Sequence, residues 1–276
     1  MHKNYYYLII IILISIILIS YNQKSIKSPN YLEENKPILN QISKENTSKI
    51  IKIIEDINKK NEKIQNLTSK INIHLNQKIS INVFGNLYFE KEKNFRMNIF
   101  SNFGKELDIG SNENLFWFWS KNSDLYYSEH KNLNQTRLKT PLNPNWLLES
   151  LTIMELKKEN IEYGKFKNFF IILQKRKGIQ NEIVTIATLI NPETKRIIGN
   201  YLYNQSGKMV ASAEINEFYE DIPKKIFITW YEEGITMEWI LYDYKINIPI
   251  NKNIWELPKI NSPINIGNPK AYKYRL

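Results

Sequence analysis

The chain has 276 residues, of which 42% are hydrophobic and 13% aromatic, which is enough apolar material for a sizeable core and excludes a disordered protein. Its formal net charge is +10, but lysines interleave with Glu and Asp along the whole chain, and arginine occurs only at positions 96, 137, 176, 196 and 275, so no nucleic-acid partner is predicted. The absence of cysteine excludes disulfides, thiolate metal sites and cysteine nucleophiles.

Residues 1–23 form an N-terminal segment in which Lys3 precedes an uncharged apolar run from Tyr5 to Tyr21. Such a run is typical of a signal peptide or of a short membrane anchor, and the basic start favours export of the body of the chain. The stretch from Leu18 to Asn22 resembles a bacterial lipobox, but Tyr21 stands where the lipidated cysteine would be. Thioether lipidation is therefore excluded, and membrane contact through residues 5–21 remains the prediction.

Residues 24–47 are polar and contain two prolines, which predicts a linker. From Ser48 to about Ser69 the apolar residues recur at helical spacing, with Lys and Glu elsewhere. The sequence therefore predicts an amphipathic helix that packs on a sheet.

From Lys70 onward the apolar period changes to two, which predicts a long antiparallel meander rather than alternating strands and helices. The expected strands include Phe166–Lys175, Glu182–Ile190 and two separate strands at Thr236–Tyr242 and Tyr244–Ile248. The run Leu115–Trp119 (LFWFW) is apolar at every position, so both faces of its strand need a cover. After Pro258, residues 259–276 are rich in Asn and Pro and are predicted to form a loose tail.

Residues 139–151 interrupt the meander with the sequence KTPLNPNWLLESL. Pro144 suits the first turn of a short helix with Asn143 as its cap. The helix would present Trp146, Leu147 and Leu148 on an apolar face, as a lid over the sheet or as an ordinary core helix.

The sequence contains no nucleophile elbow, metalloprotease motif, phosphate loop or dinucleotide fingerprint. The histidines at positions 2, 74 and 130 lack metal-ligand spacing. The sequence therefore predicts no catalytic residues, no metal, no cofactor and no enzymatic activity.

The chain instead carries more large apolar side chains than a half-solvated sheet needs. They predict either a packed core or an apolar pocket for acyl chains. The candidate cavity residues are Leu115, Phe116, Trp117, Phe118, Trp119, Trp146, Leu147, Leu148, Trp230, Met237 and Trp239.

Several short segments resemble the LolA/LolB-like lipoprotein carriers and receptors. Phe95-Arg96-Met97 is similar to an early strand of that family, ELDIGSNENLFWFW to a hairpin, and DIPKKIFITW with the following residues to the closing strands. The resemblance covers residues 48–258 and implies an α+β, mainly β fold: an antiparallel, unclosed half-barrel with a helical lid, following an N-terminal membrane segment. It also implies that Arg96 latches the lid by donating hydrogen bonds to helix-end carbonyls.

The resemblance implies an exported protein of the bacterial cell envelope, on the periplasmic side, which holds lipid or lipoprotein acyl chains non-covalently. It remains membrane-anchored or is secreted after signal cleavage. An alternative is an envelope scaffold that docks a protein partner through its aromatic face.

Overall fold

The computed structural model describes residues 47–76, 80–91, 94–136, 144–157, 161–232, 234–260 and 263–268. The predicted membrane segment, nearly all of the predicted linker and the end of the tail lie outside these ranges. Within them, no helix combines the length and the apolar character needed to cross a bilayer.

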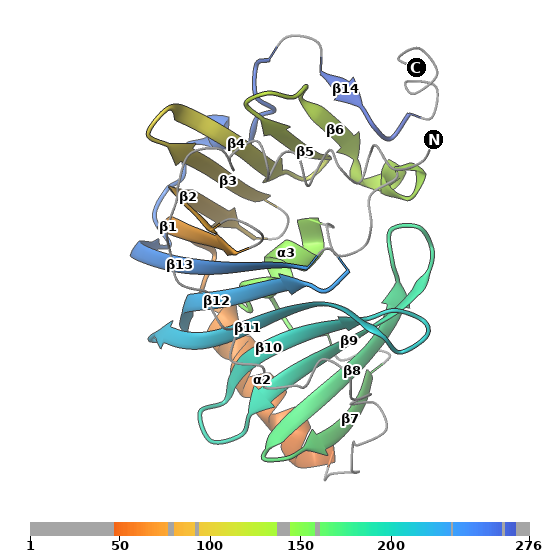
Figure 1. Cartoon of the computed structure of the whole chain (residues 1–276). Coiled ribbons are helices and arrows are strands. Elements are labelled where there is room, and N and C mark those ends of the chain that lie inside the picture. The colour runs from red at the N-terminus through yellow and green to blue at the C-terminus, as the bar shows by residue number, and fades with distance from the viewer. Residues whose placement is uncertain are drawn as a thin grey trace. The chain divides into compact units, whose positions relative to one another are not determined.

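The described chain is mainly β, with one unclosed sheet and four short helical elements (Figure 1). The hydrogen-bonded strand order is β14-β6-β5-β4-β3-β2-β1-β13-β12-β11-β10-β9-β8-β7, antiparallel in every strand pair whose register is described except β14 with β6. The helical elements are α2 Thr47–Glu62, η2 His130–Gln135, α3 Pro144–Ser150 and η4 Lys252–Trp255. The strands are β1 Asn66–Asn76, β2 Ser80–Glu90, β3 Asn94–Ser101, β4 Gly104–Ser111, β5 Leu115–Ser120, β6 Tyr126–Glu129, β7 Ile161–Phe166, β8 Phe169–Lys177, β9 Ile183–Asn191, β10 Arg196–Tyr203, β11 Met209–Tyr219, β12 Ile222–Trp230, β13 Ile235–Ile246 and β14 Ile264–Asn265.

The chain divides into two compact units. Described residues 66–136 and 241–268 belong to the first unit, and residues 47–65 and 144–240 belong to the second. Strand β13 passes from the second unit into the first after Ile240.

In the first unit, alternation along β1–β5 separates an apolar face from a polar one. Cross-strand registers place the row Leu87, Met97, Ile109 and Phe118 on the apolar face. The adjacent positions on the other face form the row Tyr88, Arg96, Gly110, Trp117 and Tyr127.

In the second unit, α2 and α3 lie on the same side of the sheet (Figure 1). The apolar stripe of α2 packs on β8, β9 and β10. The buried members of this cluster are Ile50, Ile53, Ile54, Ile57, Phe170, Ile172, Ile190 and Ile197.

Polar contacts fix both the end of α2 and the segment after α3. Asn61 donates to the carbonyl oxygens of Thr152 and Met154 at 3.1 and 2.8 Å. Lys60 pairs with Asp221 at 3.0 Å. Although burial raises the pKa of Asp221, hydrogen bonds from Lys60 and Arg196 hold it below its ordinary value.

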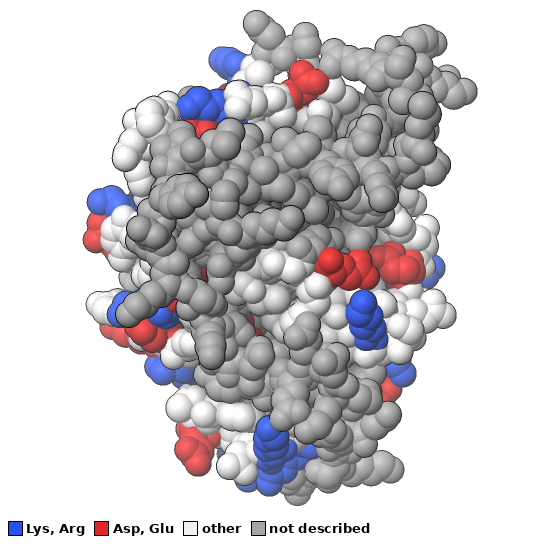
Figure 2. Space-filling view, viewed as in Figure 1, with Lys and Arg blue, Asp and Glu red and all other residues white. Residues whose placement is uncertain are grey.

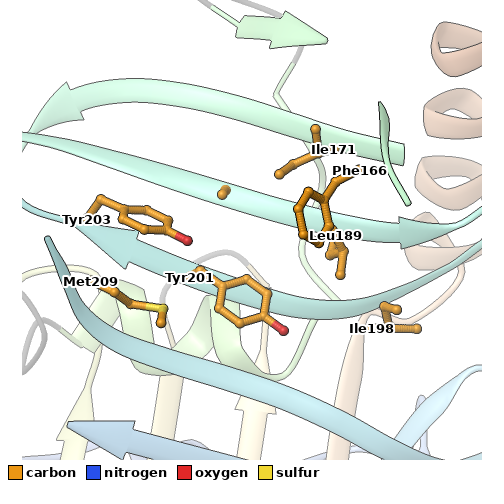
Figure 3. Close-up of a cluster of buried hydrophobic side chains, with 8 residues drawn as sticks. Phe166, Ile171, Leu189, Ile198, Tyr201, Tyr203 and Met209 are labelled. Carbon is orange, nitrogen blue, oxygen red and sulfur yellow. The ribbon is translucent and has the colours of Figure 1, made fainter. Parts of the chain in front are cut away.

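The opposite face of the same strands carries a second buried cluster (Figure 3). Tyr201 and Tyr203 lie side by side with Met209. The other buried members of this cluster are Phe166, Ile171, Ala187, Leu189 and Ile198. Strands β8–β10 are therefore buried on both faces, which explains their nearly continuous apolar sequence.

Several boundaries differ from the sequence-based prediction. The helix predicted for Ser48–Ser69 ends at Glu62, and Leu67 belongs to β1, because Leu67 fits both helical spacing from Ile64 and period two with Ile71. The predicted strand Phe166–Lys175 is broken by a tight turn, where Phe166 pairs with Phe169 and Lys167 has a φ of 54°. No Gly or Pro marks that turn in the sequence.

Near the C-terminus the prediction was also too fragmented. Thr236–Tyr242 and Tyr244–Ile248 belong largely to the one strand β13, in which Asp243 has a φ of 53°. Within the predicted loose tail, Ile264 and Asn265 pair with Tyr126 and Tyr127 of β6.

Candidate functional site

The strand predicted to be apolar on both faces is β5, and its aromatic residues divide between the two faces of the sheet. Phe116 and Phe118 lie buried on the apolar face, where Phe118 stacks on Tyr126 with 5.0 Å between ring centroids. Trp117 lies on the polar face and is fully buried. The side chains of Leu115–Trp119 therefore do not all lie on one face of the sheet.

The chain itself covers Trp117. The indole lies over Gly110, where an added Cβ would come within 2.1 Å of the ring, so only glycine fits at this position. The Trp117 Nε1 donates to Asp108 Oδ1 at 3.2 Å, and the Arg96 guanidinium lies 5.6 Å from the ring centroid. Leu115 and Trp119, also of this face, are half-buried.

A buried carboxylate organises this polar face. The side chain of Asp108 is 0% exposed and accepts hydrogen bonds from Arg96 Nε at 3.0 Å and from Arg96 Nη2 at 2.7 Å. Lys105 Nζ also donates to Asp108 Oδ2. With the Trp117 indole, both carboxylate oxygens are fully engaged, as a buried charge requires.

Arg96 extends this cluster to the short helix η4. Its Nη1 donates to the carbonyl oxygens of Ile254 and Glu256 at 2.6 and 3.3 Å. Arg96 thus donates to carbonyls at the end of a helix, but that helix is η4 of its own unit. The predicted latch from Arg96 to a lid helix, α2 or α3, stays a prediction.

The remaining predicted residues lie in the second unit and are buried. Trp146 of α3 packs on Trp230 of β12, with 6.4 Å between ring centroids. Trp230 shares its sheet face with Met237 and Trp239, because Trp230 pairs with Ile235 and Ile228 with Met237 across β12 and β13. Leu147 and Leu148 are also buried.

Two buried donors stand out in this apolar layer. The indole Nε1 groups of Trp146 and Trp239 meet no acceptor in the described part of the chain. An unpaired buried donor typically costs about 1–3 kcal/mol. A further hydrogen-bond acceptor within reach of these two indoles would therefore stabilise this layer.

Residues that sequence reasoning did not single out hold α3 in place. Arg176 of β8 binds the Glu149 carboxylate through two hydrogen bonds of 2.6 and 2.7 Å. Asn200 donates to the Glu149 carbonyl oxygen at 2.9 Å and accepts from Thr188 at 2.7 Å. The sequence gives little sign of this contact, because Arg176 and Glu149 are 27 residues apart. The one signal is an arginine that directly follows a predicted strand.

The described charged side chains form neither a basic patch on the face drawn in Figure 2 nor a metal-binding group. The described Lys and Arg side chains on the face drawn in Figure 2 lie among Asp and Glu instead of forming one basic patch. Among the described residues, no group of three or more His, Asp or Glu side chains has a metal-binding arrangement.

Comparisons with known proteins identify the fold. No family model matches the sequence, and no curated protein sequence matches it. A solved domain from Vibrio parahaemolyticus, assigned as an outer membrane lipoprotein-sorting protein, matches with a TM-score of 0.52 at 10% identity, over 74% of this chain and 95% of that one. The chain has the fold of this lipoprotein-sorting domain. The LolA/LolB-like resemblance of the sequence is therefore confirmed for the fold.

Two further solved structures resemble this chain with lower TM-scores. A DUF1329 family protein from Desulfovibrio piger has a TM-score of 0.49 at 10% identity, over 74% of this chain and 95% of its own. A LolA superfamily protein from Nitrosomonas europaea has a TM-score of 0.48 at 13% identity, over 73% and 96%.

Proposed function

We propose that this LolA-like protein holds acyl chains of a lipid or lipoprotein non-covalently against the apolar face of β12 and β13, beneath α3. The observation that carries the proposal is the layer formed by Trp146, Trp230, Met237 and Trp239. It combines a continuous apolar surface with two indole donors that lack an acceptor in the described chain. Acyl chains suit that surface, and an ester or carboxylate oxygen suits those donors.

The helix α3 has the features of a displaceable cover. It is only seven residues long, and its apolar side chains rest on β12 while Glu149 is held by Arg176. The carboxylate and the guanidinium are 30% and 27% exposed, so water can replace their mutual contact when they separate. Opening would therefore expose the apolar face without leaving a buried charge.

In this proposal the protein performs no chemical step, and transfer follows from the relative affinities of donor and acceptor sites. The fold supports a place in the cell envelope, where such acyl chains occur. Residues 5–21 would then tether the body to a membrane or direct its export.

Delipidated protein titrated with a fluorescent fatty acid tests the proposal. We expect saturable binding, and we expect Trp239→Phe to weaken it about fivefold, because the variant removes one donor while keeping an aromatic ring. The measurement is the dissociation constant from the fluorescence titration.

Trp119→Phe is the matched control, since Trp119 lies in the first unit and is absent from the proposed layer. Its affinity should equal that of the unmodified protein. Non-saturable binding, or an equal loss in both variants, would contradict the proposal.

A further inference from the structure

A groove of about 570 Å³ lies in the first unit, and its lining includes none of the site residues predicted from the sequence. Thr68, Lys70, Asn86 and Tyr88, from the polar face of β1 and β2, line one side. Residues 243–245 of β13 and the segment that follows it line the other. The volume lies within the range of small-molecule sites, about 300–1,000 Å³.

The lining has two chemical characters. Lys70 and Lys245 contribute two positive charges against the single negative charge of Asp243. The segment after β13 contributes four apolar side chains to the same groove. They are Ile248, Pro249, Ile250 and Ile254.

The polar side chains of the groove can bind a ligand, because the protein itself engages them weakly or not at all within its described part. Lys70 Nζ lies 2.8 Å from Asp243 Oδ2, but both side chains are more than half exposed. The ion pair is therefore weak, and the Lys70 amine can also bind an anionic ligand. The Lys245 amine, the Asn86 amide and the Tyr88 hydroxyl have no partner among the described residues. All three therefore remain available for binding.

The apolar wall is fixed in advance. Asn251 accepts a hydrogen bond from the Asn253 backbone N–H at 3.0 Å, which shapes the turn into η4. Arg96 holds the Ile254 carbonyl at 2.6 Å, and Asn112 Nδ2 donates to the Trp255 carbonyl at 2.9 Å. A wall already ordered in this way lowers the entropic cost of binding.

We infer that the groove binds one small amphipathic anion, a phosphate or carboxylate group that carries a short alkyl chain. The anionic head lies at Lys70 and Lys245, and the chain lies along Ile248 and Ile254. This site is separate from the proposed acyl layer, because every lining residue belongs to the first unit.

The test is a titration of the full-length protein, labelled at isoleucine δ-methyl groups, with hexyl phosphate observed by NMR. We expect saturable shifts at Ile248, Ile250 and Ile254. Inorganic phosphate and hexanol, each carrying half of the ligand, should bind at least about tenfold more weakly. Absence of saturable shifts at these methyl groups would overturn the inference.

Charge variants make the test specific. Lys70→Gln and Lys245→Gln should each weaken binding about threefold to fivefold, as expected for a solvent-exposed ion pair. The control Lys224→Gln removes a lysine of the second unit that pairs with Glu217, and should leave the affinity unchanged. Equal affinity of the Lys70→Gln/Lys245→Gln double variant and the unmodified protein would overturn the inference. Failure of acyl binding at Trp239 would not affect these shifts, so the two proposals fail separately.

Discussion

Replacing Arg96 with leucine should lower the free energy of unfolding by about 3–5 kcal/mol, measured by urea denaturation. The substitution leaves the fully buried carboxylate of Asp108 with only Lys105 and the Trp117 indole as donors. It also removes the hydrogen bonds to the carbonyls of Ile254 and Glu256. The large effect arises from the stranded charge more than from the lost contacts.

Arg196→Leu is the matched control for this measurement. Arg196 also pairs with an aspartate, Asp221, but it is 33% exposed and its partner 39%, so about 0–1 kcal/mol is expected. A double variant with both Arg96→Leu and Asp108→Leu should recover part of the loss, because it removes the unpaired charge. If the two arginine substitutions lower the free energy of unfolding equally, the buried Asp108 cluster does not contribute the stability assigned to it.

Trp146→Ala should lower the free energy of unfolding by about 3–5 kcal/mol, because the indole is 1% exposed and packs on Trp230. In the same variant, the amides of residues 145–151 should exchange faster than those of α2. The measurements are urea denaturation and exchange followed by mass spectrometry.

The exchange experiment also separates a cover from a core helix. In the unmodified protein, a cover should open locally, with a lower free energy than global unfolding. If α3 exchanges only when the whole second unit unfolds, α3 is part of the core and the proposed opening is wrong. Leu241→Ala, at a buried position in the first unit, serves as a control that should leave the local opening of α3 unchanged.

The strand content could be predicted from the sequence because period two persists along most of the chain. α3 was also predictable, since Pro144 suits only a first turn and the three following large apolar residues need a surface. The tight turn at Lys167 was missed because it contains no Gly or Pro, and its Asn168, a common turn residue, is flanked by phenylalanines that favour strands. The end of α2 was missed because Leu67 satisfies two periods at once.

The site was only partly predictable, since its polar contacts join residues that are remote in sequence. Arg96 meets Asp108 only through the register of β3 with β4, and a one-residue shift would place them on opposite faces. The pair Glu149 and Arg176 connects a helix to a strand, so no local pattern reports it. The separation of Phe116 and Phe118 from Trp117 follows from simple alternation, but the covering of Trp117 by Gly110 and Arg96 needs the fold.

A photoreactive fatty acid cross-linked to the delipidated full-length protein tests the central claim most directly. After proteolysis, mass spectrometry should locate the label on peptides of β12, β13 and α3, near Trp230, Met237 and Trp146. Excess unlabelled fatty acid should abolish the labelling. Labelling that is spread over the surface, that resists competition, or that lies wholly outside these three elements would contradict the proposal that this apolar face holds acyl chains.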